Sequence, residues 1–425
     1  MSSLIVFEKL YLHIPYQEKE WAKQEGLKFD GKAKCWYLPA GKNPLPFRDR
    51  WAYLENTYED RALLKRKGCR FNANLKQWYV PLDKDFDDFR SWWPSSLKQF
   101  LFCDERFAVH DHVTSSGQAE VYRAWDCEGE EGWVALKFFY RDLGFDSTAM
   151  VRKGVGVEID ALTKLEDHPN IAKMLGWEFR DEIERFCIAS RWVPGGDIEN
   201  LMNKTDEGVA ASLTDKFIES GLILFEDRED VISSCLEAIK DDNSDDIESD
   251  LGLLDGILEG LAYAHKNGIL HRDIKPSNVM IDVDLETEEI RPVICDFGTS
   301  KTIKLEDVGQ VKRSKFTTVE MSSAPYRPEF TPGTDSGEKE IANQHTWDLY
   351  AWSMMTIEFI TGQTVDNREE GLALLKQNLG PKVGASIQEL LGSAIAANPE
   401  DRPSDIEGFI KKLYRARTER LKALK

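Results

Sequence analysis

The chain has 425 residues, a formal net charge of −20 and 41% hydrophobic residues. This length allows two or three domains with cores of their own. The charge is uneven, because residues 1–100 hold 18 Lys and Arg against 13 Asp and Glu, whereas the remainder holds 37 against 62. Such an acidic body argues against general binding of nucleic acids or anionic membranes by the main domain, but the mildly basic first hundred residues remain open to it.

Cysteine usage and apolar segments bear on the location of the protein. The seven cysteines are an odd number and form no C-x-x-C pair, so they indicate reduced thiols rather than a disulfide framework or a zinc site. No signal-peptide pattern follows Met1, and no apolar stretch approaches the roughly 18 residues that span a bilayer. We therefore expect a soluble, cytoplasmic protein without a membrane partner.

The first hundred residues contain an internal repeat with a period of 42 residues. Each unit is predicted to contain a short strand, a charged helix (17–24 and 59–66), a glycine that ends the helix, and two strands joined by a turn. Six of the twelve tryptophans lie here. The matching positions are Tyr11 and Tyr53, Gly26 and Gly68, Phe29 and Phe71, Trp36-Tyr37 and Trp78-Tyr79, Pro39 and Pro81, and Trp51 and Trp93.

These units, at about 8–51 and 52–94, predict a tandem-repeat domain over residues 1–100. Their W-Y-x-P endings resemble a small bacterial repeat domain that is often attached to conjugative primases and other mobile-element proteins. The aromatic residues are interpreted as the core of an undersized domain; the alternative is a stacking platform for single-stranded nucleic acid. In both cases we expect the module to recruit a substrate or to sense a protein or nucleic-acid trigger.

The pattern changes after residue 105. Alternating residues predict three strands, then a helix at about 147–165, then two more strands, and helices dominate beyond residue 194. An acidic stretch at about 203–250 predicts an insertion with one or two helices, whose charges form either a solvated face or a docking site for a basic partner. The predicted strands are 107–113, 119–126, 133–140, 171–179 and 185–192.

The most informative motif is H-R-D-I-K-P-S-N at His271–Asn278, followed by Asp296-Phe297-Gly298. It combines a carboxylate that can accept a proton, a lysine directed at phosphate and two oxygen-bearing groups that suit magnesium, which is the set that phosphoryl transfer needs. The spacing resembles the catalytic loop of the eukaryotic-type protein kinases. The alternative, an ordinary charged loop between a helix and a strand, would have to match this many fixed positions by chance.

The resemblance covers most of residues 106–415 and implies an α+β fold class: a two-lobed protein-kinase-like fold preceded by the small α+β tandem-repeat domain. It implies a kinase domain over 101–425, with a small lobe at 106–193 and a large lobe at 194–415. It also implies ATP and Mg²⁺ as cofactors and a protein substrate. Lys275 is typical of members that phosphorylate serine or threonine.

The same resemblance implies roles for single residues of this motif. Asp273 is the catalytic base, and Lys275 neutralises charge on the transferred phosphoryl group. Asn278 and Asp296 are the metal ligands. Arg272, which precedes the base, is typical of kinases whose activation loop is ordered by phosphorylation.

Two segments of the small lobe are implied to bind ATP. Lys137, in Val134-Ala135-Leu136-Lys137, contacts the phosphates, and Glu158 on the following helix pairs with it. Backbone groups of Trp192 and Val193 bind the adenine edge.

The loop that covers the phosphates departs from the family pattern. With Val121 aligned to the family's valine, Thr114, Ser116 and Ala119 stand where the family has glycine, and Gly117 lies out of position. Glycines there let backbone amides approach phosphate closely. Ser116 offers a hydroxyl donor in their place. A catalytically weak pseudokinase that acts as a scaffold or binding protein is therefore the alternative function.

Further residues carry structural and regulatory predictions. Glu329 of the P-Y-R-P-E segment is expected to pair with Arg402, and Asp348 is expected to hold the backbone of the catalytic loop. For autophosphorylation, Thr317 or Thr318 is predicted; both are otherwise generic loop residues. A third hypothesis makes the repeats a nucleic-acid sensor that switches the kinase, in a bacterial response to phage or mobile elements.

Overall fold

The protein forms two compact units in the computed structural model. The first comprises Met1–Thr148 with Leu175–Trp192, and the second comprises Ala149–Met174 with Val193–Lys425. The predicted acidic insertion lies outside the described residues up to residue 247. The structure describes residues 9–40, 42–116, 119–129, 131–140, 148–165, 168–180, 185–200, 248–284, 289–302, 325–329, 334–361, 363–378 and 385–424.

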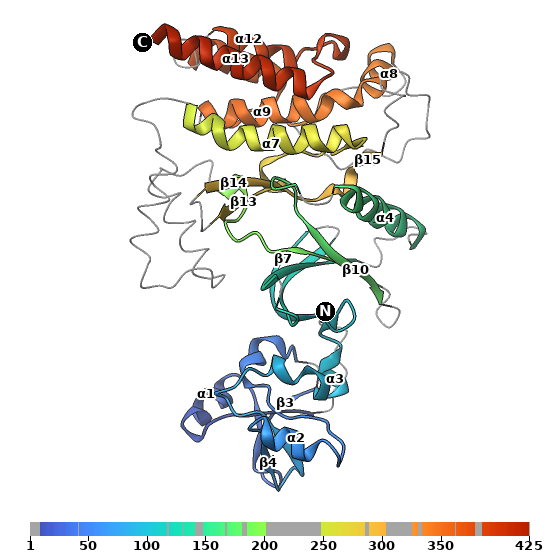
Figure 1. Cartoon of the computed structure of the whole chain (residues 1–425), viewed down its shortest axis with the longest axis vertical. Coiled ribbons are helices and arrows are strands. Elements are labelled where there is room, and N and C mark those ends of the chain that lie inside the picture. The colour runs from blue at the N-terminus through green and yellow to red at the C-terminus, as the bar shows by residue number, and fades with distance from the viewer. Residues whose placement is uncertain are drawn as a thin grey trace. The chain divides into compact units, whose positions relative to one another are not determined.

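The first unit begins with two similar arrangements, as the period of 42 residues predicts (Figure 1), except that the predicted first strand of the second copy is reduced to a single bridge between Tyr53 and Tyr79. In each copy a helix ends at a glycine with positive φ, 72° at Gly26 and 88° at Gly68, and a hairpin and a 3-10 helix follow. The elements are β1 (Lys9–Leu12), η1 (Tyr16–Glu18), α1 (Lys19–Gln24), β2 (Lys28–Asp30), β3 (Cys35–Pro39) and η2 (Leu45–Arg50), then α2 (Arg61–Arg66), β4 (Arg70–Asn72), β5 (Gln77–Tyr79) and η3 (Asp87–Trp92).

The pairing within the hairpins confirms that the two copies are equivalent. Phe29 pairs with Trp36 in the first copy, and Phe71 pairs with Trp78 in the second. The turns also match, because a side-chain oxygen of Asp30 or Asn72 accepts two backbone N–H groups of its own turn. Such turns are the local reason that Asp and Asn stand before each W-Y strand.

A six-stranded sheet with the order β10-β11-β9-β8-β7-β6 completes the first unit. All five predicted strands are present, with the helix α4 (Thr148–Lys164) between the third and the fourth. The fourth begins later than predicted, since Ile171 instead forms a bridge with Ile294 in the second unit. The elements are α3 (Ser95–Lys98), β6 (Leu101–Phe102), β7 (Phe107–Ser115), β8 (Ala119–Asp126), β9 (Trp133–Phe139), β10 (Met174–Arg180) and β11 (Arg185–Arg191).

One hydrophobic core joins the repeats to this sheet. Trp51 and Trp93 of the repeats share a buried cluster with Phe107 and Phe138 of the sheet. The two tryptophans are only 2% and 1% exposed, so they are core residues, as the core interpretation predicts. Burial of so much aromatic surface is a large part of what stabilises a unit built from short elements.

The second unit is mainly helical, and Figure 1 shows α7 and α9 side by side in it. Trp352 of α9 is fully buried, and its indole N–H donates to the Leu254 carbonyl of α7 at 2.9 Å. No helix in the described ranges combines the length and apolar character of a membrane span. The elements are η4 (Ile198–Asn200), α7 (Glu248–Lys266), β12 (Ile269–Leu270), η6 (Pro276–Asn278), β13 (Val279–Asp284), β14 (Glu289–Ile294), η7 (Phe297–Thr299), β15 (Lys301–Thr302), α8 (Asp335–Ala342), η9 (Gln344–Thr346), α9 (Trp347–Thr361), α10 (Arg368–Asn378), α12 (Ala385–Ala394), η10 (Pro399–Asp401) and α13 (Ile406–Leu424).

The predicted ion pair between Glu329 and Arg402 is wrong. The Arg402 guanidinium instead contacts Glu340 through two bonds, Nη1 to Oε2 at 3.1 Å and Nη2 to Oε1 at 2.5 Å. Glu340 lies on α8, which packs against η10 just before Arg402. Glu329 is exposed. The motif-based prediction failed because the partner stands eleven residues beyond the P-Y-R-P-E segment.

Candidate active site

The hairpin of β13 and β14 brings two separate motifs to the same end of one element. Val279 pairs with Ile294, and the Cys295 N–H donates to the Asn278 carbonyl at 2.9 Å. Asn278 directly precedes β13, and Asp296 is the second residue after the end of β14. The two predicted metal ligands therefore emerge from neighbouring chain segments. Across the described ranges there is no group of three or more His, Cys, Asp or Glu that could hold a metal.

The predicted catalytic side chains of the segment His271–Asn278 contact one another. Lys275 Nζ lies 3.0 Å from Asp273 Oδ2. The Asn278 amide nitrogen donates to the Asp273 carbonyl oxygen at 2.8 Å and to its Oδ2 at 3.1 Å. Because the amide N–H groups are used in this way, the oxygen of Asn278 is left as an acceptor. Asn278 is only 7% exposed, so its orientation is fixed by packing as well as by hydrogen bonds.

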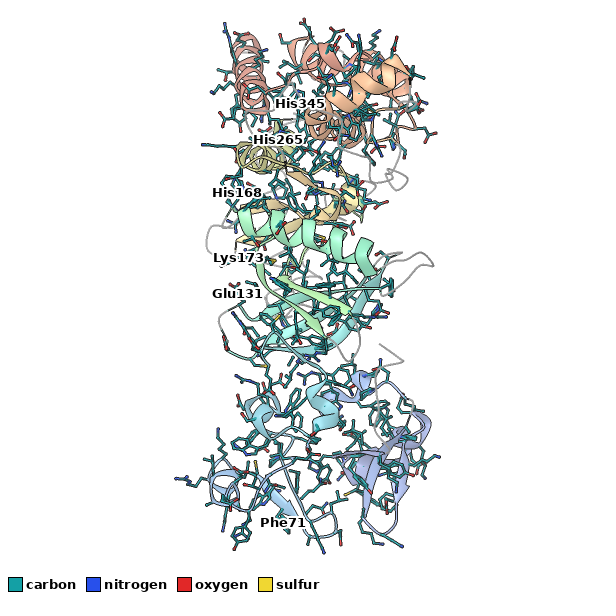
Figure 2. All side chains as sticks on the ribbon, turned by 90° about the vertical axis from the view of Figure 1, so that its right-hand side faces the viewer. Phe71, Glu131, His168, Lys173, His265 and His345 are labelled. Atoms are coloured by element: carbon teal, nitrogen blue, oxygen red, sulfur yellow. The ribbon has the colours of Figure 1, made fainter. Side chains whose placement is uncertain are left out.

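The backbone of this loop is held by Asp348 of α9, as predicted. The Asp348 carboxylate accepts the His271 N–H at 2.9 Å and the Arg272 N–H at 2.6 Å. It also contacts His265 Nε2 at 2.7 Å, and Figure 2 labels His265. Asp348 is fully buried, and although burial opposes ionisation, the contacts with His265 and with the Arg272 N–H lower its pKa.

His271 connects the two motifs. Its Nε2 contacts the Cys295 carbonyl at 3.0 Å, and its Nδ1 accepts the Asp273 N–H at 3.3 Å. Since a carbonyl can only accept and an N–H can only donate, the proton lies on Nε2. The imidazole ring packs edge-on against Phe297, with centroids 4.6 Å apart, and both side chains are fully buried.

Two residues of the site adopt left-handed backbone conformations, Arg272 with φ 66° and Asp296 with φ 61°. For residues with a Cβ this conformation costs roughly 1–2 kcal/mol and is concentrated at functional sites. Asp296 Oδ1 accepts the Gly298 N–H at 3.3 Å. A Cβ at Gly298 would lie 3.1 Å from that oxygen and 3.3 Å from Glu158 Oε2. Glycine therefore leaves room for both carboxylates, and buried Glu158 of α4 lies beside this segment.

A group of cations surrounds Arg272, and the sequence analysis missed two of its members. Arg272 donates to the Thr299 carbonyl at 2.9 Å. Burial lowers its pKa. Burial and the charge of Arg272 also lower the pKa of Lys301 and lower that of Arg327 to about 10. Lys301 follows Asp296-Phe297-Gly298 closely and Arg327 lies in P-Y-R-P-E, but neither motif indicates that they converge.

Of the predicted ATP-binding residues of the small lobe, Lys137, Val121 and Trp192 lie in the first unit. Lys137 of β9 is opposite Val121 of β8 and Ile188 of β11. The Trp192 N–H donates to the Trp133 carbonyl at 3.4 Å. The pair of Lys137 with Glu158 would join residues of the two units, and it stays a prediction.

The loop that departs from the glycine pattern closes on itself. The Ser116 N–H donates to the Ala119 carbonyl at 2.8 Å, and the Ala119 N–H donates to Ser116 Oγ at 3.1 Å. Gly117 lies outside the described residues, as do Thr317 and Thr318. Val193, the remaining candidate for adenine binding, is 7% exposed and belongs to the second unit.

Comparison with known families agrees with this geometry. Residues 230–423 match the family described as "Protein kinase domain", and residues 9–52 match a "Domain of unknown function (DUF5710)". The first match includes the catalytic loop and the hairpin, and it supports a eukaryotic-type protein kinase domain with a mixed helix and strand fold. Such domains generally use ATP and Mg²⁺.

Individual relatives are described as serine/threonine-protein kinases. The chain is 25% identical over 309 residues to the meiosis-specific serine/threonine-protein kinase mek1 of Schizosaccharomyces pombe, which covers 71% of this chain and 58% of that protein. It is 28% identical over 166 residues to PknL of Mycobacterium tuberculosis, covering 36% and 37%. It is 30% identical over 193 residues to the LRR receptor-like kinase RGI1 of Arabidopsis thaliana, covering 39% and 16%. The chain thus spans less than two thirds of the length of each of these relatives.

Proposed function

We propose that the protein transfers the γ-phosphoryl group of ATP to serine or threonine of a protein substrate. The observation that carries this proposal is the gathering of Asp273, Lys275 and Asn278 by direct contacts, with Asp296 at the same end of the β13–β14 hairpin. An ordinary charged loop has no need of two left-handed residues and a fully buried aspartate that binds its backbone.

Each of these side chains has a proposed role in the transfer. Asp273 is fixed by Asn278 and Lys275, so its carboxylate can orient an acceptor hydroxyl and take its proton. Lys275 is positioned to neutralise charge on the phosphoryl group. The Asn278 oxygen and the Asp296 carboxylate are hard donors that fit Mg²⁺, which typically takes one or two protein ligands together with the nucleotide phosphates. When bound, the ion supplies charge stabilisation of those phosphates.

The direct test is transfer of labelled phosphate from ATP to a generic basic protein. Asp273→Asn should reduce transfer by about 10²–10⁴-fold while leaving nucleotide binding intact, since it removes the base and keeps the side-chain shape. Asp366→Asn, which changes an exposed carboxylate of the same unit, is the matched control and should transfer normally. Undiminished transfer by Asp273→Asn refutes the proposal.

A second candidate is a weakly catalytic pseudokinase that serves as a scaffold. The closed Ser116–Ala119 turn favours it, because the Ser116 N–H is engaged within the loop instead of being directed at phosphate. In that case Ser116→Gly with Ala119→Gly should tighten ATP binding and raise transfer. The scaffold role is supported if wild type shows no measurable transfer and if wild type and Asp273→Asn bind their partners equally well.

The cations around Arg272 support a regulatory role for that residue. The positive charge of Arg272 repels those of Lys301 and Arg327. A phosphate group would relieve this repulsion by accepting charge-assisted hydrogen bonds. Phosphorylation of Thr317 or Thr318 is the proposed source. Mass spectrometry of the autophosphorylated protein, compared with Thr317→Ala and Thr318→Ala, tests the assignment.

The repeats have exposed aromatic residues at equivalent positions, which supports a nucleic-acid trigger. Phe29 and Phe71 are 51% and 52% exposed, and Tyr16 and Tyr58 are 76% and 72% exposed. Figure 2 labels Phe71 at the margin of the repeats. Lys19 Nζ lies 4.5 Å from the Tyr16 ring centroid, and an arginine occupies the equivalent place over Tyr58. Exposed rings with adjacent cations suit stacking of single-stranded bases.

This trigger would fit the hypothesis of a bacterial response to phage or mobile elements. Fluorescence anisotropy with a labelled single-stranded oligonucleotide should show binding that weakens with salt. Phe29→Ser with Phe71→Ser should reduce it at least tenfold, since each stacked base contributes about 1–3 kcal/mol. Leu63→Ser, another exposed apolar residue of the repeats, is the control. If the oligonucleotide neither binds nor changes the rate of phosphoryl transfer, the nucleic-acid role is wrong.

A further inference from the structure

Equivalent arginines of the two repeats bind the backbone of the adjoining sheet. The period of 42 residues relates Arg48 to Arg90. Arg48 Nε donates to the Val109 carbonyl of β7 at 3.0 Å, and Arg90 Nη1 donates to the Cys127 carbonyl, directly after β8, at 3.1 Å. Both bonds lie within the first unit, whereas the catalytic loop belongs to the second. Each repeat is therefore bonded to the sheet through its own arginine.

The side chain of Arg48 is fixed by residues of both repeats. Its Nη2 donates to the two carboxylate oxygens of Asp87 in the second repeat, each at 2.9 Å. The guanidinium lies 5.2 Å from the ring centroid of Trp51 and 5.3 Å from that of Trp93. Arg48 and Asp87 are 8% and 6% exposed. The direction in which Arg48 Nε points is thus set by the packing of the two repeats.

The acceptor of this bond lies at a bulge in β7. Val109 pairs with Ala124 of β8, whereas Asp111 pairs with Arg123, so His110 is an extra residue in β7. Bulges bend a strand, are over-represented next to active sites and re-aim side chains. The bulge of β7 is therefore a feature whose support has a consequence for the rest of the strand.

The repeats contact both residues of this bulge. Val109 accepts the bond from Arg48, and His110 Nε2 lies 3.5 Å from Asp87 Oδ2. The His110 ring also packs edge-on against that of Trp133, with centroids 4.8 Å apart. Val109 is fully buried, and a buried carbonyl that lacks a donor is costly. The pair of Arg48 and Asp87 therefore stabilises the bulged form of β7.

The bulge decides the register of the strand beyond it. Thr114 pairs with Val121, after a second register shift between His112 and Thr114. Without the shift at His110, the same strand would place Thr114 opposite Glu120. A change of register by one residue turns side chains to the other face of a sheet.

β7 leads directly into the turn that is predicted to cover the phosphates of ATP. The strand ends at Ser115, and hydrogen bonds of 2.8 and 3.1 Å join Ser116 to Ala119 across the turn. We propose that Arg48 is a positioning residue for this turn, because it holds the bulge of β7 and thereby sets the place of Ser116. This inference rests on the proposed function, and it makes the repeats part of the apparatus that binds ATP.

Isothermal titration calorimetry of the full chain with MgATP tests this role, because it measures the affinity and the fraction of competent protein separately. In Arg48→Lys the ammonium group can still pair with Asp87, but a methylene group replaces Nε and cannot donate to Val109. The dissociation constant should rise about three to tenfold, the effect of one lost hydrogen bond, while the stoichiometry stays at one. A merely structural role would instead lower the stoichiometry and leave the dissociation constant unchanged.

A second variant guards against a loss of folding. Arg48→Met with Asp87→Leu removes the donor to Val109 without leaving a buried charge unpaired. It should weaken ATP binding by the same factor as Arg48→Lys. The matched control is Arg90→Lys, which removes the equivalent bond at the end of β8 that lies away from the turn, and it should bind ATP as wild type does.

Hydrogen exchange of peptides from β7 and β8 supplies a measurement that does not depend on nucleotide. Arg48→Lys should speed exchange of the amides of residues 111–122 at least threefold, and Arg90→Lys should not. Wild type that binds ATP but transfers no phosphate refutes the proposed transfer, and weaker binding by Arg48→Lys would still support the role of Arg48. This role is overturned if wild type does not bind ATP, if Arg48→Lys matches wild type in affinity or in exchange, or if Arg90→Lys weakens binding as much.

Discussion

Removing one partner of the buried ion pair of Glu340 with Arg402 should strongly destabilise the second unit. Glu340→Gln keeps the shape of the side chain but leaves the Arg402 guanidinium, whose side chain is 2% exposed, without its counter-charge. Removing one partner of a buried ion pair costs about 3–5 kcal/mol. Because the amide retains one acceptor for the guanidinium, we expect a loss of about 3 kcal/mol in the free energy of unfolding of the second unit.

The assay is urea unfolding followed by hydrogen exchange and mass spectrometry of peptides from α8 and α9, which reports on this unit by itself. The matched control is Glu329→Gln, an exposed carboxylate that should change the free energy of unfolding by less than about 0.5 kcal/mol. The double variant Glu340→Leu with Arg402→Met should lose less than the sum of its single changes. If Glu329→Gln costs as much as Glu340→Gln, the pairing described here is wrong.

Three further predictions follow from buried charges. Asp348→Ala should reduce phosphoryl transfer and cost about 3 kcal/mol in the free energy of unfolding, because two loop N–H groups lose their acceptor; normal transfer would contradict this. Burial raises the pKa of Asp255 from 3.8 to about 6, so between these pH values the folded state binds more protons than the unfolded state. The free energy of unfolding should therefore fall as the pH rises through this window. Urea unfolding midpoints measured at several pH values should show this decrease in wild type but not in Asp255→Asn. Arg48→Met should lower the free energy of unfolding, measured by thermal unfolding, by about 3–5 kcal/mol, because it leaves the buried Asp87 carboxylate without its partner. Adding Asp87→Leu should restore most of this loss.

The repeat and the strands could be predicted because their signals are local. The helix-ending glycines, the Asp and Asn turns and the alternation in 119–126 each depend on neighbours a few residues away. Boundaries were less accurate where a non-local contact competes. The fourth strand of the sheet, for example, begins after Ile171 because that residue pairs with Ile294.

The features that the sequence analysis missed are contacts between distant segments. The common core of the repeats and the sheet depends on side chains such as Arg48, whose partners Asp87 and Val109 are 39 and 61 residues away. No spacing rule connects such positions, since the same residue types would suit a solvated surface. The cations around Arg272 were missed for the same reason.

The catalytic loop is the exception, and its geometry explains why. The left-handed turns at Arg272 and Asp296 are stabilised mainly by contacts within the motif and by Asp348. His271 contacts both Cys295 and Asp273. The Gly298 N–H donates to the Asp296 carboxylate, and the Asn278 amide donates to Asp273. A site whose strained residues are anchored by one another must carry its partners at fixed spacings, so its geometry is visible in the sequence. Arg402 is anchored by a helix outside its motif, and its partner was therefore found only in the structure.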